Sequence, residues 1–236
     1  MPYYVYVAVA SEQKILLFSM SPKTGQLTPK QGFPLEGSPT PLAMDPKQKY
    51  LYAGLRADNS STIVSFHIDP GTGGLTQIGN LELGADPCYL ATDKTGRFVL
   101  SAYYRAGMVT VHPIDNDGAA CGPLVNTQKT ASKAHYIETD SKNRFAFAPH
   151  VGESNAIFQF CLDQQSGKLS PNSVPKVDGG PGQGPRHLAF HPTKPIIYAD
   201  NEQESSVSVY DFDTASGTLK RVQTLSTLPE EGFRGE

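Results

Sequence analysis

Short apolar runs separated by polar turns occupy the whole chain. Within many runs, apolar and polar residues alternate over about four to six positions, as in VSVYDF at 207–212, and Gly, Pro or Asp bounds each run. This alternation predicts half-buried β-strands. No stretch sustains an apolar repeat of about 3.6 residues, so we expect few helices. The pattern predicts an all-β protein.

The runs recur as a unit of roughly fifty residues. Each unit opens with a turn and an apolar strand that ends at an acidic or His-Pro corner, and the four copies begin at Pro41, Pro87, Ala134 and Pro185. A second apolar run follows each copy, at 50–54, 98–102, 145–148 and 196–200. A third strand comes next, at 63–68, 108–112, 156–160 and 207–212.

A turn close to Asp-x-x-x-Gly-x-Leu follows the third strand of each unit, and its leucine begins a fourth strand. These leucines are Leu27, Leu75, Leu124, Leu169 and Leu219. Four antiparallel strands per repeat are typical of the blade of a β-propeller. The runs at 3–9 and 14–20 match the later strands of a blade whose inner strand is absent or supplied elsewhere. We count about five blades and expect residues 1–236 to form one β-propeller domain, incomplete at its C-terminus.

Composition and charge exclude several classes of function. Lys plus Arg is 20 and Asp plus Glu is 23, a formal net charge of −3, which gives no reason to expect a nucleic-acid or membrane partner. Cys88, Cys121 and Cys161 form no CxxC pair, so we expect reduced thiols rather than disulfides or zinc ligands. No signal peptide or membrane span is evident, which favours a cytoplasmic location. We found no metal-binding or cofactor-binding motif, and we expect neither group.

Polar side chains at equivalent places of the repeat form a candidate site. Arg186 lies at the start of an inner strand, and His135 is its counterpart one repeat earlier. Glu202 follows a second strand, and His150 lies in the corresponding loop of the preceding repeat. A guanidinium can bind an anion or an oxyanion, and His or Glu can transfer protons. Each residue also has a structural alternative: Arg186 could pair with a neighbouring carboxylate, Glu202 could be a solvated turn acid, and each histidine could be a hydrogen-bonded structural residue.

Three segments resemble one known family. GPRHLAFHP at 184–192, YADNEQESSVSVYDFD at 198–213 and TLP at 227–229 are similar to the seven-bladed β-propeller lactonases. That family includes propeller-type 6-phosphogluconolactonases and carboxy-cis,cis-muconate lactonizing enzymes. The resemblance implies seven blades, of which this chain has about five. It also implies a small anionic lactone as the substrate, with hydrolysis of 6-phosphogluconolactone to 6-phosphogluconate as the expected reaction. The position of Arg186 in the repeat places this reaction at the channel mouth, and the lack of a metal-binding motif predicts acid–base catalysis without a metal.

The resemblance and the repeat together assign roles to particular residues. The expected catalytic residues are Arg186, Glu202, His135 and His150, and the expected substrate-binding residues are Arg186, His187, Asn201 and Arg105. A muconate-type cycloisomerase could use the same groups, and a non-catalytic binding scaffold is the second alternative, because a propeller fold alone does not imply an activity.

Overall fold

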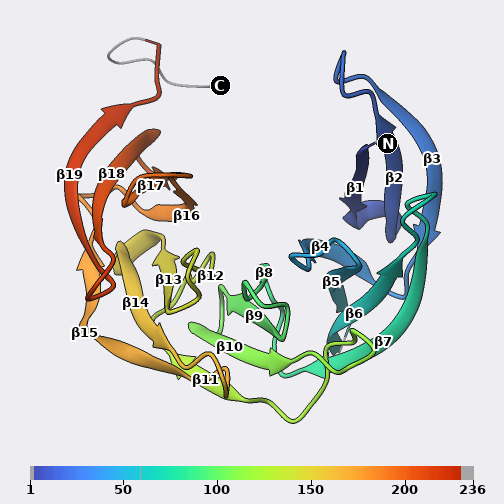
Figure 1. The fold of residues 1–236 in the computed structure, drawn as a ribbon. Coiled ribbons are helices and arrows are strands. Elements are labelled where there is room, and N and C mark those ends of the chain that lie inside the picture. Colours follow the sequence, from blue (N-terminus) through green and yellow to red (C-terminus); the bar gives the residue numbers. More distant parts are fainter. Residues whose placement is uncertain (1–2, 59, 230–236) are drawn as a thin grey trace. The chain divides into compact units, whose positions relative to one another are not determined.

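A computed structural model of the chain describes residues 3–58 and 60–229, and within them the structure is built from β-strands and turns (Figure 1). The strands are β1 Tyr3–Val9, β2 Lys14–Met20, β3 Leu27–Pro34, β4 Ser38–Met44, β5 Tyr50–Ala57, β6 Ser60–Ile68, β7 Leu75–Leu83, β8 Tyr89–Thr92, β9 Phe98–Tyr103, β10 Met108–Pro113, β11 Asn126–Lys129, β12 Glu138–Thr139, β13 Phe145–His150, β14 Ala156–Leu162, β15 Leu169–Asp178, β16 Pro185–Phe190, β17 Ile196–Asn201, β18 Ser206–Asp213 and β19 Thr218–Ser226. Two short 3-10 helices, η1 Ala10–Glu12 and η2 Gly152–Ser154, are the helical segments of the described residues.

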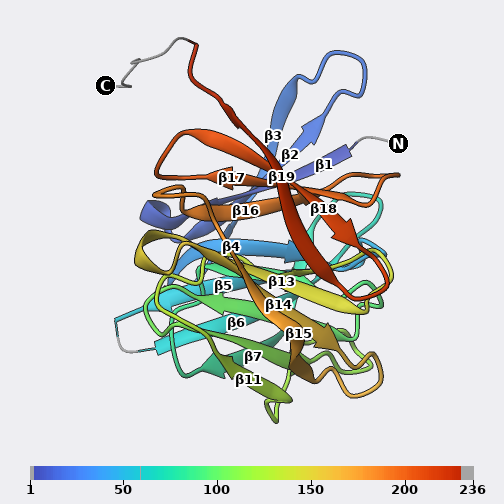
Figure 2. The same ribbon diagram turned by 90° about the vertical axis from the view of Figure 1, so that its left-hand side faces the viewer.

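Each sheet is made of strands that follow one another in the sequence. The first sheet has three strands, β1-β2-β3, and the other four sheets have four strands each: β4 to β7, β8 to β11, β12 to β15 and β16 to β19 (Figures 1 and 2). Antiparallel meanders of this kind are propeller blades. The predicted all-β class is confirmed, and within residues 3–58 and 60–229 the first sheet has three strands and no inner fourth strand.

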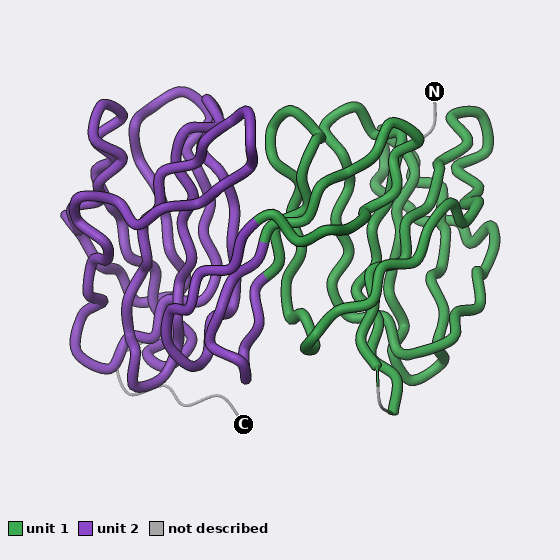
Figure 3. Tube along the Cα trace, turned by 90° about the horizontal axis from the view of Figure 1, so that it is seen from below, with its two compact units in different colours: residues 1–101, 111–125 green, residues 102–110, 126–236 purple. Residues whose placement is uncertain are grey.

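The contacts divide the chain into two compact units, coloured separately in Figure 3. Unit 1 contains residues 1–101 and 111–125, and unit 2 contains residues 102–110 and 126–236. The expectation of a single domain stays a prediction.

The turn between the third and fourth strands has the same chemistry in both units. Asp69 accepts hydrogen bonds from the backbone N–H groups of Gly71 and Thr72 at 3.1 and 2.7 Å. Asp213 accepts the equivalent bonds from Ala215 and Ser216 at 2.8 and 3.4 Å. The Thr72 hydroxyl, which donates to the same oxygen of Asp69 at 2.7 Å, is the largest cause that holds the pKa of Asp69 below its usual value, and the backbone bonds add to it. For Asp213 the Ala215 N–H is the largest cause of a pKa lowered in the same direction. The aspartate therefore fixes the turn that the sequence repeat predicted.

The turn glycine lies against an aromatic ring of another sheet. In unit 1 the backbone of Gly118 lies on Tyr50, and a Cβ there would be 2.2 Å from the ring. In unit 2 Gly217 lies on Phe145 in the same way, also at 2.2 Å. Both glycines have positive φ, +91° and +73°, so the turn needs glycine for its backbone conformation and for the close approach of the ring.

A second hydrogen-bonding arrangement is repeated at the corner after the first strand of a blade. Asp93 is fully buried and its Oδ1 accepts the N–H groups of Arg97 and Phe98 at 2.7 and 2.9 Å. In the last repeat His191 takes this place, and its Nδ1 accepts the N–H groups of Thr193 and Lys194 at 3.1 and 3.0 Å. The His-Pro corner of the last repeat is thus the structural counterpart of the aspartate corner of the others.

Apolar side chains fill the space between the sheets of each unit. Strand β5 contributes to two cores of unit 1, because Leu51 and Leu55 pack in one cluster and Tyr52 packs in another. In unit 2 Phe212 packs edge-on against Phe147, with ring centroids 5.5 Å apart. These alternate inward-facing residues are the ones that the period-two pattern marked.

Two strands differ from the sequence prediction. The strand expected at Leu124 begins at Asn126 instead; Pro123 has no N–H to donate to a ladder there. The inner strand expected over 134–140 is reduced to Glu138–Thr139, with an isolated bridge from Ala134 to His150. The interruption falls at residues 135–137 and bears directly on the candidate site.

Candidate active site

Arg186 and Glu202 lie at the same end of one hairpin in unit 2. Pro185 in β16 is paired with Asn201 in β17, so the residues that follow each of them are close. The register shifts between Pro185 and Leu188, and a shift of this kind turns side chains away from the regular alternation. The equivalent segment one repeat earlier contains His135, where the ladder is also interrupted. The same local irregularity therefore presents both predicted residues.

The Arg186 guanidinium forms an ion pair with Glu202. Its Nε lies 2.8 Å from Oε2 of Glu202, and the two side chains are 38% and 46% exposed. A pair this exposed contributes little to stability, at most about 1 kcal/mol. Within residues 3–58 and 60–229, the two terminal nitrogens of Arg186 have no hydrogen-bonding partner. The pair therefore orients a guanidinium whose outer edge is available to an anion.

Two histidines lie beside this ion pair. The rings of His135 and His187 are in edge contact, with centroids 5.0 Å apart. Burial lowers the pKa of both imidazoles, and the positive charge of Arg186 lowers it further. The Glu202 carboxylate acts in the opposite direction on both, and the Asp200 carboxylate raises the pKa of His187 by more than Arg186 lowers it, so burial is what keeps that pKa low. Both rings are therefore neutral at pH 7, and a neutral imidazole can accept a proton.

Aromatic and acidic residues that the sequence reasoning missed position the histidines. The ring of Tyr104 contacts His135 edge-on at 5.8 Å, and the ring of Tyr136 lies 5.5 Å from His187. The backbone N–H of His187, displaced from the ladder by the register shift, donates to Oδ1 of Asp200 at 2.5 Å. Tyr136 follows His135 and Asp200 precedes Asn201. This position next to a predicted site residue is the sequence feature that could have indicated their role.

His150 is not brought to this cluster. Its side chain is fully buried, and its ring packs 4.4 Å from that of Phe158. Nδ1 lies 2.9 Å from the carbonyl oxygen of Ala148, and Nε2 lies 2.8 Å from the hydroxyl of Thr130. A carbonyl oxygen can only accept, so Nδ1 carries the proton and Nε2 accepts from Thr130. The surroundings of His150 are those of a structural residue.

We expect the burial of His150 to make folding stability depend on pH. Burial lowers the pKa of His150 from 6.5 to about 4. Above pH 6.5 the imidazole is neutral in both states and has no effect. As the pH falls from 6.5 to about 4 the unfolded chain binds a proton that the folded chain does not, which lowers the free energy of unfolding by about 3 kcal/mol. Urea unfolding at several pH values should show a shallower decline for His150→Asn than for the wild type; equal slopes would contradict the assignment.

Asn201 holds the hairpin together. Its side chain is buried, and Nδ2 donates to the hydroxyls of Ser206 and Ser208 at 2.9 Å each. Ser208 also donates to Oε1 of Gln183, in the loop that precedes Arg186. Asn201 therefore fixes both ends of the hairpin that carries the ion pair. A direct role in substrate binding stays a prediction.

Arg105 is exposed in the turn between β9 and β10, one residue after Tyr104. The Tyr104 ring contacts His135, so this turn lies near the cluster. Among the described residues the Arg105 side chain has no ion-pair or hydrogen-bond partner. Its expected role in anion binding stays a prediction.

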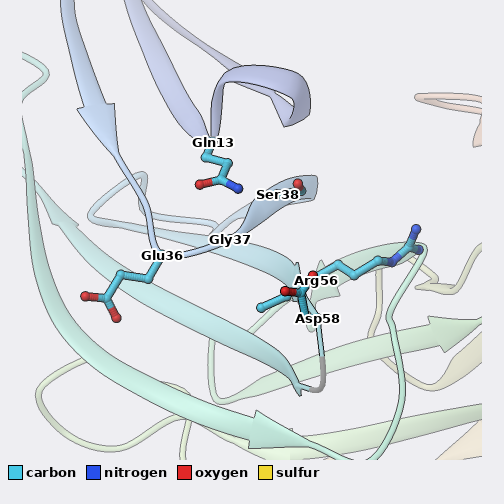
Figure 4. A pocket seen from close by; sticks show the side chains of 7 residues that line it. Gln13, Glu36, Gly37, Ser38, Arg56 and Asp58 are labelled. Carbon is cyan, nitrogen blue, oxygen red and sulfur yellow. The ribbon is translucent and has the colours of Figure 1, made fainter.

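Unit 1 has a polar pocket in the loops that correspond to the Glu202 loop. It has a volume of about 520 Å³ and is lined by Gln13, Glu36, Gly37, Ser38, Arg56, Ala57 and Asp58 (Figure 4). Figure 4 shows the side chains of Glu36 and Arg56 extending in opposite directions. Nε of Arg56 pairs with Oδ2 of Asp86 at 2.8 Å, so a carboxylate already offsets its charge. The pocket does not contain the combination of arginine and neutral histidines found in unit 2.

Two further features bear on the class of site. Among residues 3–58 and 60–229, no three His, Cys, Asp or Glu side chains are grouped as metal ligands would be. Neither 3-10 helix of that part of the chain is long and apolar enough to cross a bilayer.

Comparison with known proteins shows relatives along nearly the full length of this chain. It is 36% identical over 225 residues to the 6-phosphogluconolactonase of Pectobacterium carotovorum subsp. carotovorum, covering 95% of this chain and 66% of that protein. It is 35% identical over 228 residues to the 6-phosphogluconolactonase of Yersinia enterocolitica, covering 96% of this chain and 66% of that protein. The chain thus spans about two thirds of the length of these relatives.

Solved structures have the same fold. The periplasmic gluconolactonase of Pseudomonas aeruginosa superimposes with a TM-score of 0.87 at 25% identity, over 100% of this chain and 71% of that one. A protein from Lactobacillus plantarum superimposes with a TM-score of 0.85 at 23% identity, over 98% and 69% of the two chains. The second likeness supports the fold alone.

A family model described as "Lactonase, 7-bladed beta-propeller" matches residues 4–236. The family that the Gly-Pro-Arg-His and Asn-Glu segments suggested is therefore confirmed, together with a propeller of which about five of seven blades are present. The chain belongs to the seven-bladed β-propeller lactonase family.

Proposed function

We propose that this protein is a lactonase that hydrolyses a sugar-derived lactone. The first candidate substrate is 6-phosphogluconolactone. The observation that carries the proposal is the grouping of the Arg186–Glu202 ion pair with His135 and His187 in unit 2. The Pectobacterium and Yersinia relatives are both named 6-phosphogluconolactonase. These names favour hydrolysis over cycloisomerisation and over a non-catalytic scaffold.

The chemistry follows from the charges of the cluster. Water adds to the lactone carbonyl carbon while neutral His135 accepts a proton from it. The carbonyl oxygen becomes an oxyanion, and the terminal nitrogens of Arg186 stabilise it. The ring C–O bond then breaks, and the protonated imidazole returns its proton to the leaving alkoxide oxygen. The product is a hydroxy acid that ionises at neutral pH. Glu202 positions Arg186 through the ion pair at Nε.

A pH–rate profile tests this assignment. The pKa of His135 lies below its ordinary value of 6.5 because of burial and the Arg186 charge, so the working neutral form predominates at pH 7. We expect kcat/KM, corrected for spontaneous opening of the lactone, to be level near pH 7 and to fall as the pH drops below 6.5. His135→Gln should lower kcat/KM by about 10²–10⁴-fold and abolish the acid limb.

His67→Gln is a matched control, because His67 lies in unit 1 with its ring against Tyr50. A folded wild-type chain that opens the lactone no faster than buffer would overturn the proposed activity. A His135→Gln variant that keeps the wild-type rate and profile would overturn the role of His135.

A cytoplasmic location stays a prediction. The cysteines Cys88, Cys121 and Cys161 are free thiols, which suits a reducing compartment, whereas the Pseudomonas structure is named a periplasmic gluconolactonase.

A further inference from the structure

Lys133 is held in an unusual backbone conformation two residues before His135. Its φ is +66°, in the left-handed region that residues other than Gly, Asn and Asp rarely adopt. Its N–H donates to the Tyr104 carbonyl oxygen at 2.7 Å, and its own carbonyl accepts from Val151 N–H at 3.2 Å. Strain of this kind persists only where surrounding contacts fix it, and it occurs most often at functional sites.

The Lys133 side chain lies directly over Gly152. A Cβ at Gly152 would be 2.5 Å from Nζ of Lys133 and 2.6 Å from its Cδ. Only glycine leaves room for the lysine there. The N–H of Gly152 donates to Oε1 of Gln203 at 2.8 Å, and Gln203 follows Glu202. The ammonium group is therefore placed beside the loop that carries the ion pair.

The ammonium group of Lys133 has no counter-ion among the described residues. Glu153, the residue after Gly152, does not form an ion pair with it. Arg105 is likewise uncompensated, and its turn is tied to Lys133 through the Tyr104 carbonyl. Two neighbouring loops thus carry two cations that have no partner in the part of the chain that the structure describes.

Lys133 and Arg105 differ from the catalytic cluster in net charge. Arg186 is offset by Glu202, and His135 and His187 are held neutral by burial and by Arg186. The cluster has almost no net positive charge to offer to a phosphate dianion. Lys133 and Arg105 can provide it, since an ammonium donates up to three charge-assisted hydrogen bonds.

We propose that Lys133, with Arg105 as a second contact, binds the phosphate group of a phosphorylated sugar lactone while Arg186 binds its lactone group. This inference rests on the proposed lactonase function for its choice of substrate. It assigns discrimination between phosphorylated and unphosphorylated lactones to Lys133.

Binding of inorganic phosphate tests the site without any turnover. We would titrate the purified chain with inorganic phosphate and follow the amide NMR signals of Gly152 and Gln203. Lys133→Met should raise the Kd by about tenfold or more, as loss of a charge-assisted hydrogen bond implies. Lys220→Met is the matched control, because Lys220 is an exposed lysine of β19 in the same unit. An unchanged Kd in Lys133→Met, or a wild type that does not bind phosphate, would overturn the proposal.

Kinetics with two substrates then tests specificity. We expect Lys133→Met to raise KM for 6-phosphogluconolactone about tenfold and to leave KM for unphosphorylated gluconolactone unchanged. Gly152→Ala should have the same effect, because its Cβ would displace the lysine; circular dichroism would verify that both variants fold. An equal rise in KM for both substrates would contradict phosphate binding by Lys133. A wild type without lactonase activity would overturn the proposed function, and the phosphate titration would still decide the role of Lys133.

Discussion

Arg186→Met is expected to lower kcat/KM for the lactone by about 10²–10³-fold, the range found when a donor to a developing oxyanion is removed. The guanidinium of Arg186 remains positively charged at every working pH, and among the described residues its terminal nitrogens have no hydrogen-bonding partner and are open to a ligand. Because its pair with Glu202 is exposed, we expect the free energy of unfolding to change by less than about 1 kcal/mol. Steady-state kinetics and urea unfolding of the same preparation would separate the two effects.

Arg56→Met is a matched control for this substitution. Arg56 also pairs through Nε with a carboxylate at 2.8 Å, and it is 51% exposed, but it lies in unit 1. We expect its kcat/KM to equal that of the wild type. Glu202→Gln should reduce the rate less than Arg186→Met, and the double variant should be no slower than Arg186→Met alone, since Glu202 acts through the guanidinium. A double variant that is slower by the product of both effects would show that Glu202 acts independently.

Gly217→Ala is expected to have the largest effect on stability, lowering the free energy of unfolding by about 2–4 kcal/mol. The new Cβ would lie 2.2 Å from Cδ1 of Phe145. That ring cannot move aside easily, because Phe212 packs edge-on against it at 6.3 Å and the Arg144 guanidinium lies over it at 5.2 Å. Alanine would also be strained at φ +73°.

Gly25→Ala isolates the backbone part of this effect. Gly25 occupies the same place in the turn of the first sheet with φ +71°, and a Cβ there meets no atom within 4 Å. We expect Gly25→Ala to cost only about 1 kcal/mol, the strain of a left-handed alanine. Urea unfolding followed by circular dichroism measures both. Equal shifts of the two midpoints would show that contact with Phe145 contributes nothing.

Much of the fold could be predicted from sequence, because its determinants are local. The turn aspartates, the turn glycines and the period-two strands all act within a few residues of their own position, so a repeat in sequence becomes a repeat in structure. The prediction was wrong where the determinant was a proline or a break in a ladder: β11 begins after Pro123, and β12 is limited to Glu138–Thr139.

The site was less predictable, because it depends on side-chain direction and burial. The register correctly placed Arg186 and Glu202 at the same end of one hairpin. It could not distinguish His135, which lies beside Arg186, from His150, which is buried against Phe158. No pattern in the sequence indicates a role for Lys133, because its backbone conformation and its position over Gly152 arise from contacts between loops.

The docking of turn glycines on aromatic rings also sets an order of events during synthesis of the chain. Pairing within each sheet joins sequence neighbours and can begin as soon as two strands have left the ribosome. Docking comes later: the Tyr6 hydroxyl reaches the Gly73 carbonyl across 67 residues, and the Tyr52 hydroxyl reaches the Gly118 carbonyl across 66. Each of these tyrosines gains its partner only when the third strand and the turn of the next repeat have been made. A nascent blade is therefore a marginal meander until its successor is translated, and a ribosomal pause just before such a turn would prolong its exposure to proteases and chaperones.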